Sequence, residues 1–462
     1  MDYMREYEKW LASPALTPEE HAELESIRGD EKEIRERFYG PLEFGTAGLR
    51  GTMKVGLHQM NVHVIRWATQ GFANVICAEG EEAKRRGVAL CMDCRNHSME
   101  FARAAAEVCA ANGIHVRIFE SLRPTPELSF AVREYGCQAG INVTASHNPA
   151  IYNGIKVFIK GGRDADETVT ADIERYIAAV DPASIHPVPY EQALAEGLVE
   201  EINPQNPYLD SIIRGINMDA IRSRELKIIL DPMYGVSKTS LQTILLTARC
   251  DVDVIHDRHD TLFGGRLPAP NMETLGTLRN TVLERRADIG IATDGDADRL
   301  GIIDDKGEFV HPNQILVILY YYLLKYKGWH GPAVRNIATT HLLDKVAAAF
   351  GEQCYEVPVG FKHISAKMLE TNAVIGGESS GGLTVRGHIQ GKDGIYAASL
   401  LVEMLAVTGK KLSEIYEEIV REYGCLVMAE RDYRFSPQRK TEIVKLLMED
   451  KKLPEFPCET LK

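Results

Sequence analysis

The stretch "GVALCMDCRNHSMEFARAAAEVCAANGIHVRIFE", residues 87–120, places a strand, a helix and a second strand in immediate succession. Its apolar opening, residues 87–93, predicts a buried strand, and "SMEFARAAAEVCAANG" predicts a helix that starts at a serine and stops at Asn-Gly. "IHVRIFE" then predicts the next strand. Alternation of this kind indicates a mostly parallel sheet covered by helices.

The same alternation restarts further along the chain. It restarts at "LKIILDPMYG" (226–235), which is followed by "VSKTSLQTILLTA" and "CDVDVIHD", and again at 334–351, continuing to 373–382. The proline-rich segments 202–208 and 309–314 are plausible boundaries between these parts. A length of 462 residues also predicts roughly three domains. The sequence therefore indicates a multidomain α/β protein.

Composition narrows the class of protein. The net charge of -13 argues against binding to nucleic acid or to an anionic membrane. The charged N-terminus has no apolar core of signal-peptide length, and the apolar run 315–324 is too short to span a bilayer. Nine scattered cysteines predict reduced thiols and a cytoplasmic location. "CMDC" (91–94) has redox or zinc spacing, but without a second pair a strand end is the better interpretation.

One polar loop follows the strand expected before residue 144. "TASHNPAIYNGIKV" (144–157) gathers Ser146, His147 and Lys156 around an Asn-Pro turn. Turn chemistry explains the asparagine and proline but not the hydroxyl, imidazole and ammonium. Ligands of open parallel sheets bind beyond the carboxyl ends of the strands. This loop is therefore a candidate site.

A second loop, within "ADIGIATDGDADRLGIIDDKG" (287–307), carries Asp294, Asp296 and Asp298 between two predicted strands. Three carboxylates at alternate positions repel one another unless a cation lies among them, and Mg²⁺ with oxygen ligands is the simplest candidate. A solvated acidic turn is the alternative, whereas a calcium loop lacks its bidentate glutamate. Arg299 in the same loop favours a nearby phosphate, because guanidinium binds phosphate oxygens bidentately.

Three further loops fit a sugar phosphate, each with a simpler alternative. "GGESSGG" (376–382) places Glu378 and Ser380 on a turn that could equally be a glycine-rich turn without function. "GKDGI" (391–395) offers Lys392, although its aspartate could simply start a helix. "FGTAGLRG" (44–51) offers Arg50 on a glycine-rich loop of the kind that cradles phosphate or is merely flexible.

Taken together and in this order, the five loops resemble the alpha-D-phosphohexomutases, the phosphoglucomutase/phosphomannomutase superfamily. The opening "FGTAGLRG…MN…GFANVI" is most similar to the phosphoglucomutase branch that includes phosphopentomutases. The resemblance extends over essentially the whole chain. It implies three similar α/β/α domains with mixed, mostly parallel sheets.

The resemblance also assigns roles. It implies that Ser146 is phosphorylated in the resting enzyme and that one Mg²⁺ is held by the phosphoserine and the three aspartates of 294–298. Arg50 and Arg299 match basic residues around the transferring phosphoryl group, and His147 and Lys156 flank the serine as candidate proton acceptors. Substrate-binding positions are matched by the following residues: Gly360, Lys362, Glu378, Ser380 and Lys392, the last near the substrate's phosphate end.

The sequence departs from the family pattern at three places. Val359 replaces a threonine that can face the sugar. In the sugar loop, Ser379 and Gly382 replace residues more usual in the family, which bears on sugar specificity. The C-terminal Arg-x-Ser-Gly-Thr-Glu-Pro phosphate loop has no counterpart here, and residues 431–453 resemble only the opening strand and helix of the fourth domain. The fourth domain is thus expected as a truncated α+β remnant.

We therefore expect domains at 1–205 with the serine loop, 206–312 with the metal loop, 313–424 with the sugar loop, and a remnant at 425–462. The expected activity interconverts glucose 1-phosphate and glucose 6-phosphate through phosphoserine, with glucose 1,6-bisphosphate as intermediate and activator. Phosphomannomutase or phosphopentomutase activity is the alternative within the class. A sugar-phosphate-binding protein without turnover is the alternative outside it. The sequence does not indicate an oligomeric state.

Overall fold

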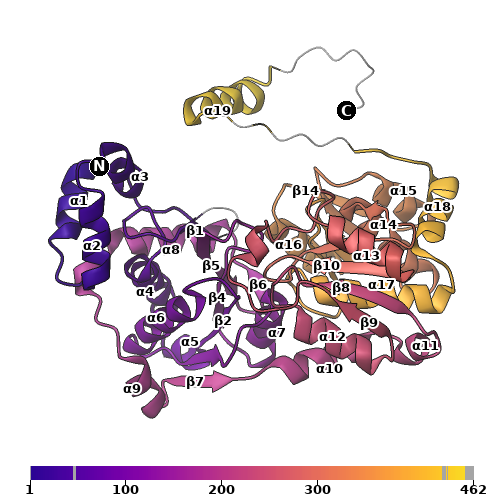
Figure 1. Ribbon diagram of the computed structural model, residues 1–462, viewed down its shortest axis with the longest axis horizontal. Helices are drawn as coiled ribbons and strands as arrows, with labels where there is room; N and C mark the ends of the chain where they lie inside the picture. Colours follow the sequence, from indigo (N-terminus) through magenta and orange to yellow (C-terminus); the bar gives the residue numbers. More distant parts are fainter. Residues whose placement is uncertain (1, 45–47, 429–432, 434, 453–462) are drawn as a thin grey trace. The chain divides into compact units, whose positions relative to one another are not determined.

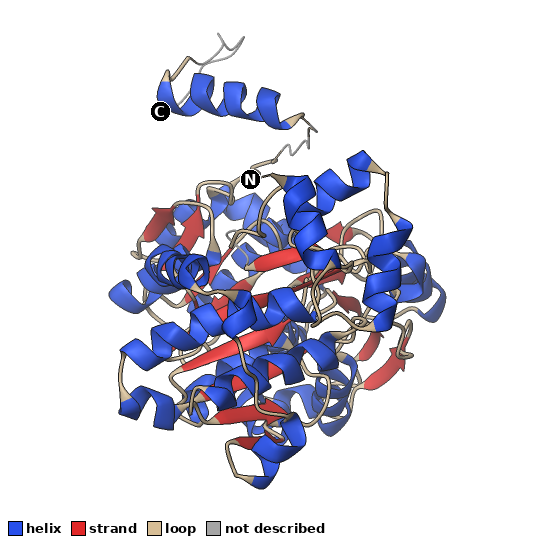
Figure 2. Cartoon of the chain, turned by 90° about the vertical axis from the view of Figure 1, so that its left-hand side faces the viewer, coloured by secondary structure: helices blue, strands red, loops and turns tan. Residues whose placement is uncertain are grey.

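The computed structural model describes residues 2–44, 48–428, 433 and 435–452. They form two units, residues 1–425 and 426–462. The larger unit contains three sheets in chain order, with helices on both sides of the strands (Figures 1 and 2). The fold class predicted from the sequence, successive α/β/α layers, is confirmed. No described helix is long and apolar enough to cross a membrane.

The first sheet has seven strands in the order β1-β5-β4-β2-β3-β7, with β6 paired to β5. Strands β4, β2, β3 and β7 run parallel, whereas β1, β5 and β6 add an antiparallel edge. Their bounds are β1 Leu49–Thr52, β2 Val88–Met92, β3 Val116–Phe119, β4 Ala139–Val143, β5 Tyr152–Ile159, β6 Arg163–Asp164 and β7 Val199–Ile202.

Helices cover this sheet and extend it at the N-terminus. The covering helices are α4 Val62–Ala78, α5 Glu81–Arg86, α6 Ser98–Ala111, α7 Thr125–Glu134, α8 Glu167–Ala179, the short η1 Pro182–Ser184 and α9 Tyr190–Ala195. Three helices precede it and share a small apolar core of their own: α1 Tyr3–Leu11, α2 Pro18–Ser26 and α3 Glu31–Phe38.

The second sheet has the order β12-β11-β10-β8-β9 and is also mixed, because β10 runs parallel to β8 but antiparallel to β11. Its strands are β8 Lys227–Asp231, β9 Asp251–Val254, β10 Ile289–Thr293, β11 Leu300–Ile303 and β12 Phe309–Val310. Its helices are α10 Gln205–Gly215, α11 Met218–Arg222, α12 Lys238–Thr247, η2 Phe263–Gly265 and α13 Gly276–Arg285.

The third sheet has the order β14-β13-β15-β16, again with one antiparallel pair at the edge. Its strands are β13 Ala333–Asn336, β14 Cys354–Val357, β15 Ile375–Gly377 and β16 Leu383–Val385. Its helices are α14 Pro312–Lys325, α15 Leu342–Ala349, α16 Phe361–Thr371, α17 Gly394–Thr408 and α18 Leu412–Tyr423.

Local sequence accounts for most element boundaries. Helix α6 ends at Asn112 and Gly113, whose φ of 70° is accessible to glycine without strain. The serine start predicted for α6 is confirmed, since Ser98 is the first residue of the helix. His97 occupies the N-cap, and the Ser98 hydroxyl instead donates to Asp93 Oδ1 at 2.9 Å. A buried acceptor in the core thus takes the serine away from its usual capping role.

The apolar run at 315–324 becomes the buried interior of α14, as predicted. Because α14 is apolar on all sides, it needs protein on all sides. One continuous apolar core contains α14, α17 and residues of the second sheet, such as Ile228 and Ile302. The second and third sheets therefore share a core, which fixes the loops at their strand ends relative to one another.

The smaller unit contains helix α19, Pro437–Val444, which continues as the π-helical turn η3, Lys445–Glu449. The helix expected there is present. The strand expected before it falls largely on residues 429–432 and 434, which lie outside the described residues.

A buried acid in α7 provides a test of this packing. Glu127 is fully buried, and within the described chain neither of its carboxylate oxygens has a hydrogen-bond partner. Burial raises its pKa to about 8; Arg123, whose Nε lies 3.7 Å from Oε1, opposes the shift, and Asp393 adds to it. The folded chain must therefore keep a proton that the unfolded chain releases above its ordinary pKa of about 4.3.

We expect Glu127→Gln to stabilise the protein relative to wild type as pH rises from 5 to 8. Between those values the native state binds the extra proton, so wild-type stability falls as pH rises, whereas the amide pays no such cost. The gain should reach on the order of 2–4 kcal/mol at pH 8. Thermal unfolding at both pH values measures it, with the exposed Glu134→Gln as control. Equal shifts in the two variants would contradict the assignment.

Candidate active site

The serine loop begins where β4 ends. Ser146 is almost fully buried and has a φ of 52°, a left-handed conformation that is uncommon for a residue with a side chain. Its backbone N–H donates to Thr144 Oγ1 at 2.8 Å. The loop is thus held in a strained shape by local hydrogen bonds, a feature often found where function requires it.

Arg95 holds this loop in place through hydrogen bonds to its backbone carbonyls. Its Nη2 donates to the carbonyls of Ser146 and Asn148, both at 2.7 Å. Its Nη1 donates to those of Pro149 at 2.9 Å and Tyr152 at 3.0 Å. Four carbonyls on one buried guanidinium explain how the left-handed serine persists. Sequence reasoning missed Arg95, although an arginine two residues after a strand-end aspartate was a visible signal.

The three aspartates predicted as metal ligands lie between β10 and β11 and are all buried. One oxygen from each can be chosen so that the three atoms lie within 4.8 Å of one another. The Ser146 hydroxyl donates to Asp294 Oδ2 at 2.8 Å. The structure therefore brings the serine loop and the acidic loop together, from different sheets.

Two ammonium groups neutralise the acidic loop. Lys156 Nζ lies 2.7 Å from Asp296 Oδ2 and 2.9 Å from Asp298 Oδ2. Lys392 Nζ lies 2.9 Å from the same Asp298 oxygen. The cation required by three neighbouring carboxylates is thus partly supplied by side chains. Lys392, expected near the far phosphate of the substrate, is at the acidic loop, while the neighbouring Asp393 caps α17.

The carboxylates differ in their protonation. Burial raises the pKa of Asp294 well above its usual range, and the charges of Asp296 and Asp298 add to this. Burial also opposes ionisation of Asp298, but Lys156, Lys392 and Arg299 outweigh it and hold its pKa well below the usual range. The loop therefore combines a carboxylate that is hard to ionise with one that is firmly ionised.

The same loop fits a divalent metal. Asp296 Oδ1 and Asp298 Oδ1 are buried, and within the described chain neither has a hydrogen-bond partner. Unpaired buried oxygens are costly unless a ligand satisfies them. A set made only of carboxylate and hydroxyl oxygens suits Mg²⁺ rather than a softer metal. The residues present are therefore compatible with the predicted magnesium.

Arg50 and Arg299 are the two arginines predicted to surround the transferring phosphoryl group. Each has a buried Nε without a hydrogen-bond partner among the described residues. Arg50 Nη1 donates to Asn148 Oδ1 at 2.7 Å. The loop expected around Arg50 is corrected: Arg50 lies on β1, paired with Gly154 of β5, and only residues 45–47 of that stretch lie outside the described residues. A strand holds its guanidinium more firmly than a loop would.

His147 Nδ1 lies 3.4 Å from Ser146 Oγ. Burial lowers the pKa of His147 to about 3, and the positive charges of Arg299 and Arg50 contribute to the shift. The imidazole is therefore neutral at physiological pH. Lys156, by contrast, is driven further above its usual pKa by Asp296 and Asp298, despite burial that favours the neutral amine.

Thr125, at the first position of α7, positions the acidic loop from the first sheet. Its Oγ1 donates to Asp296 Oδ2 at 2.6 Å, and its N–H donates to the Asp296 carbonyl at 2.9 Å. The Asn142 amide in turn donates to the Thr125 hydroxyl. Sequence reasoning missed Thr125, because its partner is 171 residues away and no local pattern marks such a contact.

The predicted sugar-binding residues other than Lys392 lie between β15 and β16 and at the start of α16, in the third sheet's layer. Glu378 accepts from Asn336 Nδ2 at 3.2 Å and from Ser380 Oγ at 3.4 Å. Gly360, with a φ of 127°, precedes α16. Lys362 Nζ lies 2.6 Å from Glu167 Oε1, at the start of α8 in the first sheet's layer. Val359, noted for its departure from the family, is more than half exposed.

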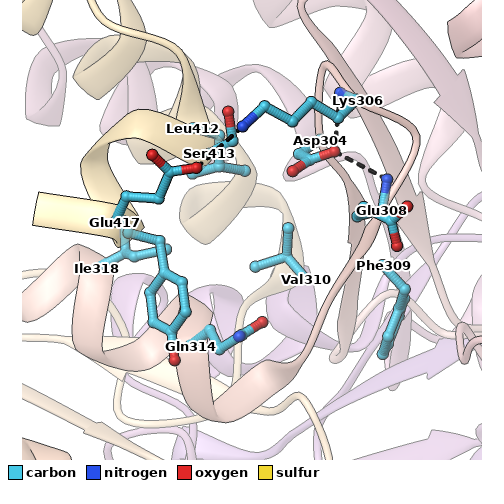
Figure 3. A pocket seen from close by; sticks show the side chains of 11 residues that line it. Asp304, Lys306, Glu308, Phe309, Val310, Gln314, Ile318, Leu412, Ser413 and Glu417 are labelled. Carbon is cyan, nitrogen blue, oxygen red and sulfur yellow. Dashed lines mark hydrogen bonds and ion pairs between the residues drawn. The ribbon is translucent and has the colours of Figure 1, made fainter. Parts of the chain in front are cut away.

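Two other features do not belong to this site. Cys91 and Cys94 are buried thiols whose pKa values are raised by burial, as expected for a strand end rather than a redox pair. A cavity of about 300 Å³ lies beside α14 and α18 (Figure 3). Its lining residues include Asp304, Phe309 and Tyr416, and none of the predicted site residues.

Comparison with known proteins shows which family this chain resembles. Three models of the phosphoglucomutase/phosphomannomutase family match the chain: alpha/beta/alpha domain I at 41–184, domain II at 206–307 and domain III at 311–423. The domain boundaries expected from sequence stay predictions.

Individual relatives agree on the family but differ in name. A phosphoglucomutase/phosphomannomutase of Thermococcus kodakarensis is 30% identical over 380 residues, 82% of this chain and 80% of its own. A protein of Pyrococcus abyssi named a probable phosphoglucosamine mutase is 31% identical, covering 71% and 70%. A crystal structure from Thermus thermophilus with a phosphomannomutase assignment superposes with a TM-score of 0.76 at 30% identity, over 83% of this chain and 84% of that one.

We expect Asp296→Asn to weaken Mg²⁺ binding at least about tenfold, since losing even an outer-sphere partner of a metal typically costs that much. The fold should be little affected, because Lys156 keeps Asp298 as a partner and Thr125 can donate to the amide oxygen. Isothermal titration with Mg²⁺ measures the affinity. Asp305→Asn, on the distant turn after β11, is the matched control. Unchanged affinity in Asp296→Asn would indicate that the acidic loop is not the metal site.

Proposed function

We propose a specific activity for this chain, which belongs to the phosphoglucomutase/phosphomannomutase family of phosphohexomutases: it interconverts hexose 1-phosphate and hexose 6-phosphate, with glucose as the hexose. Enzymes of this family are isomerases that act by intramolecular phosphotransfer. The proposed route runs through a phosphorylated Ser146 and a hexose 1,6-bisphosphate. Glucose 1,6-bisphosphate would load the serine and so act as activator.

The observation that carries this proposal is the contact between Ser146 Oγ and Asp294 Oδ2, at 2.8 Å, inside a buried cluster of acids and bases. A hydroxyl beside an acidic loop is a poor nucleophile by itself. It can carry a phosphoryl group, however, when neighbouring groups neutralise the negative charge of that group. Phosphoryl transfer depends mostly on positioning and on electrostatic stabilisation, which this cluster is built to provide.

Asp294, Asp296 and Asp298 would hold the Mg²⁺, together with the oxygens on Ser146. When bound, the metal supplies charge neutralisation for the phosphoryl group and orients it. Arg50 and Arg299, each with a buried Nε that no described residue satisfies, would bind the equatorial phosphoryl oxygens. Arg95 keeps the serine aimed at these groups through the loop carbonyls.

Proton movements divide between two residues. His147 is unprotonated at neutral pH and near Ser146 Oγ, so it enters the reaction as a proton acceptor. Lys156 is protonated and paired with two carboxylates, so it can donate to a leaving oxygen but cannot act as a base without first losing its proton. We therefore assign Lys156 to the donor role and His147 to the acceptor role.

Recognition of the sugar would fall to the third sheet. Glu378 and Ser380 offer a carboxylate and a hydroxyl on a glycine-flanked turn, and Asn336 orients the carboxylate. Lys362, at the start of α16, would bind the substrate after leaving Glu167. Lys392 bridges the two regions, because its ammonium lies on Asp298 and 5.9 Å from the centre of the Phe361 ring.

We expect incubation with glucose 1,6-bisphosphate and Mg²⁺ to add one phosphate, at Ser146. Peptide mass spectrometry locates it. Ser146→Ala should take up none and lose mutase activity, whereas the surface variant Ser184→Ala should behave as wild type. Phosphate found only at other residues, or full activity in Ser146→Ala, would refute the serine route.

Substrate preference should follow in a coupled assay across glucose, mannose, glucosamine and pentose 1-phosphates, each with its bisphosphate activator. We expect the highest kcat/KM for glucose 1-phosphate. A higher kcat/KM for another sugar phosphate would change the proposed substrate but not the proposed class of reaction. Tight binding with no turnover of any sugar would instead favour the non-catalytic sugar-phosphate binder.

A further inference from the structure

Asp164, on the two-residue strand β6, has a carboxylate that the fold does not use. Within residues 2–44, 48–428, 433 and 435–452, its side chain has no hydrogen bond and no ion pair. Its neighbours do serve the fold: Asp166 caps α8 and lies 3.8 Å from Arg163. The side chain is half-buried, and its oxygens are not among the fully buried side-chain atoms that lack a partner in the described chain, so they remain accessible to a ligand.

The pairing of β6 with β5 fixes where this side chain points. Asp164 is directly opposite Phe158 in an antiparallel pair. Opposed residues of such a pair share a face of the sheet, and residues two apart along a strand share it as well. Lys156 is two residues before Phe158, so Asp164 lies on the face that carries Lys156 into the acidic loop.

The charges around Asp164 are those of the active site. Burial raises its pKa; Lys392 and Lys156 favour its ionised form, and Asp298 and Glu378 oppose it. Lys392 is already paired with Asp298, and Glu378 already accepts from Asn336 and Ser380. Asp164 is thus the carboxylate of this group that has neither a hydrogen bond nor an ion pair among the described residues.

Contacts with the third sheet's layer place β6 beside the sugar loops. Strand β6 contacts α16, which begins directly after Gly360 (Figure 1). The turn before β6 lies beside the loop that carries Lys392, because a Cβ on Gly391 would be in ordinary contact with the Gly162 carbonyl, at 3.6 Å. Asp164 therefore faces the third-sheet loops from the side of the first sheet.

We propose that Asp164 is a specificity-determining residue, which accepts a hydrogen bond from one hydroxyl of the bound hexose while Glu378 and Ser380 bind the sugar from the third sheet. This inference rests on the proposed function. The sugar would then be held by carboxylates from two layers, and its orientation would be fixed by which hydroxyl meets Asp164. A site built to accept from a hydroxyl rejects an analogue without it, because the bound sugar then covers the carboxylate and leaves it unpaired.

A cycle between enzyme and substrate variants tests the contact. We would titrate glucose 1-phosphate and its 2-, 3- and 4-deoxy analogues calorimetrically, with Mg²⁺, into Ser146→Ala protein with and without Asp164→Asn. In the parent, one deoxy analogue should bind roughly 10- to 100-fold more weakly, as expected for a lost hydrogen bond to a charged group. In Asp164→Asn, glucose 1-phosphate should lose a similar factor, and that analogue should lose little more.

Controls separate the possible failures. Asp172→Asn, on the exposed side of the nearby α8, should leave all affinities unchanged, and Asp164→Ser provides a second variant if the amide disturbs folding. If the affinity loss from Asp164→Asn added to the loss from each deoxy substitution, no hydroxyl would be coupled to Asp164. That result, or unchanged affinity in Asp164→Asn, would overturn this inference and leave the proposed function standing. Failure of the Ser146→Ala parent to bind any hexose phosphate would overturn the proposed function and this inference together.

Discussion

Burying three carboxylates at the end of one strand is the constraint on which the rest of the large unit depends. Asp294, Asp296 and Asp298 come from the second sheet, and their desolvation has to be compensated by positive charge. Lys156 comes from the first sheet and Lys392 from the loop before α17, beside the third. The ion pairs therefore connect all three sheets at the acidic loop.

This arrangement has a consequence for the serine. Ser146 donates to Asp294 of the second sheet from a loop whose backbone is left-handed at that residue. Arg95 stabilises the turn through buried carbonyls, and Thr125 fixes the acidic loop from the same side. The serine loop is strained at Ser146 and held by Arg95, and the acidic loop is held by Thr125. These contacts keep two loops from separate sheets within hydrogen-bond distance of each other.

Sequence reasoning succeeded where the signal is local. The strand–helix alternation of 87–120 predicted β2, α6 and β3, and the apolar run 315–324 predicted a buried helix. The serine and aspartate loops were recognisable because several unusual residues gather within a few positions at strand ends. The serine that starts α6 was also predicted, but its hydrogen bond to Asp93 carried no signal in the local sequence.

Contacts between distant segments could not be predicted in the same way. Thr125 and Asp296, or Lys392 and Asp298, are ordinary residues in their own surroundings and become a site only when the sheets meet. Arg50 was expected on a loop, because glycines precede it, but pairing with β5 makes its position a strand. Asp164 carried no sequence signal, since its importance lies in a missing partner.

The charge balance of the cluster explains why metal and phosphoryl group would be acquired together. Three aspartates face four cations, Lys156, Lys392, Arg50 and Arg299, so the site has a net positive charge before either ligand is added. A phosphoserine adds about two negative charges, and Mg²⁺ adds two positive ones. Mg²⁺ alone would leave this buried site strongly positive, whereas both together restore the original balance. Each ligand should therefore raise the affinity for the other, a reciprocity that thermodynamic linkage requires.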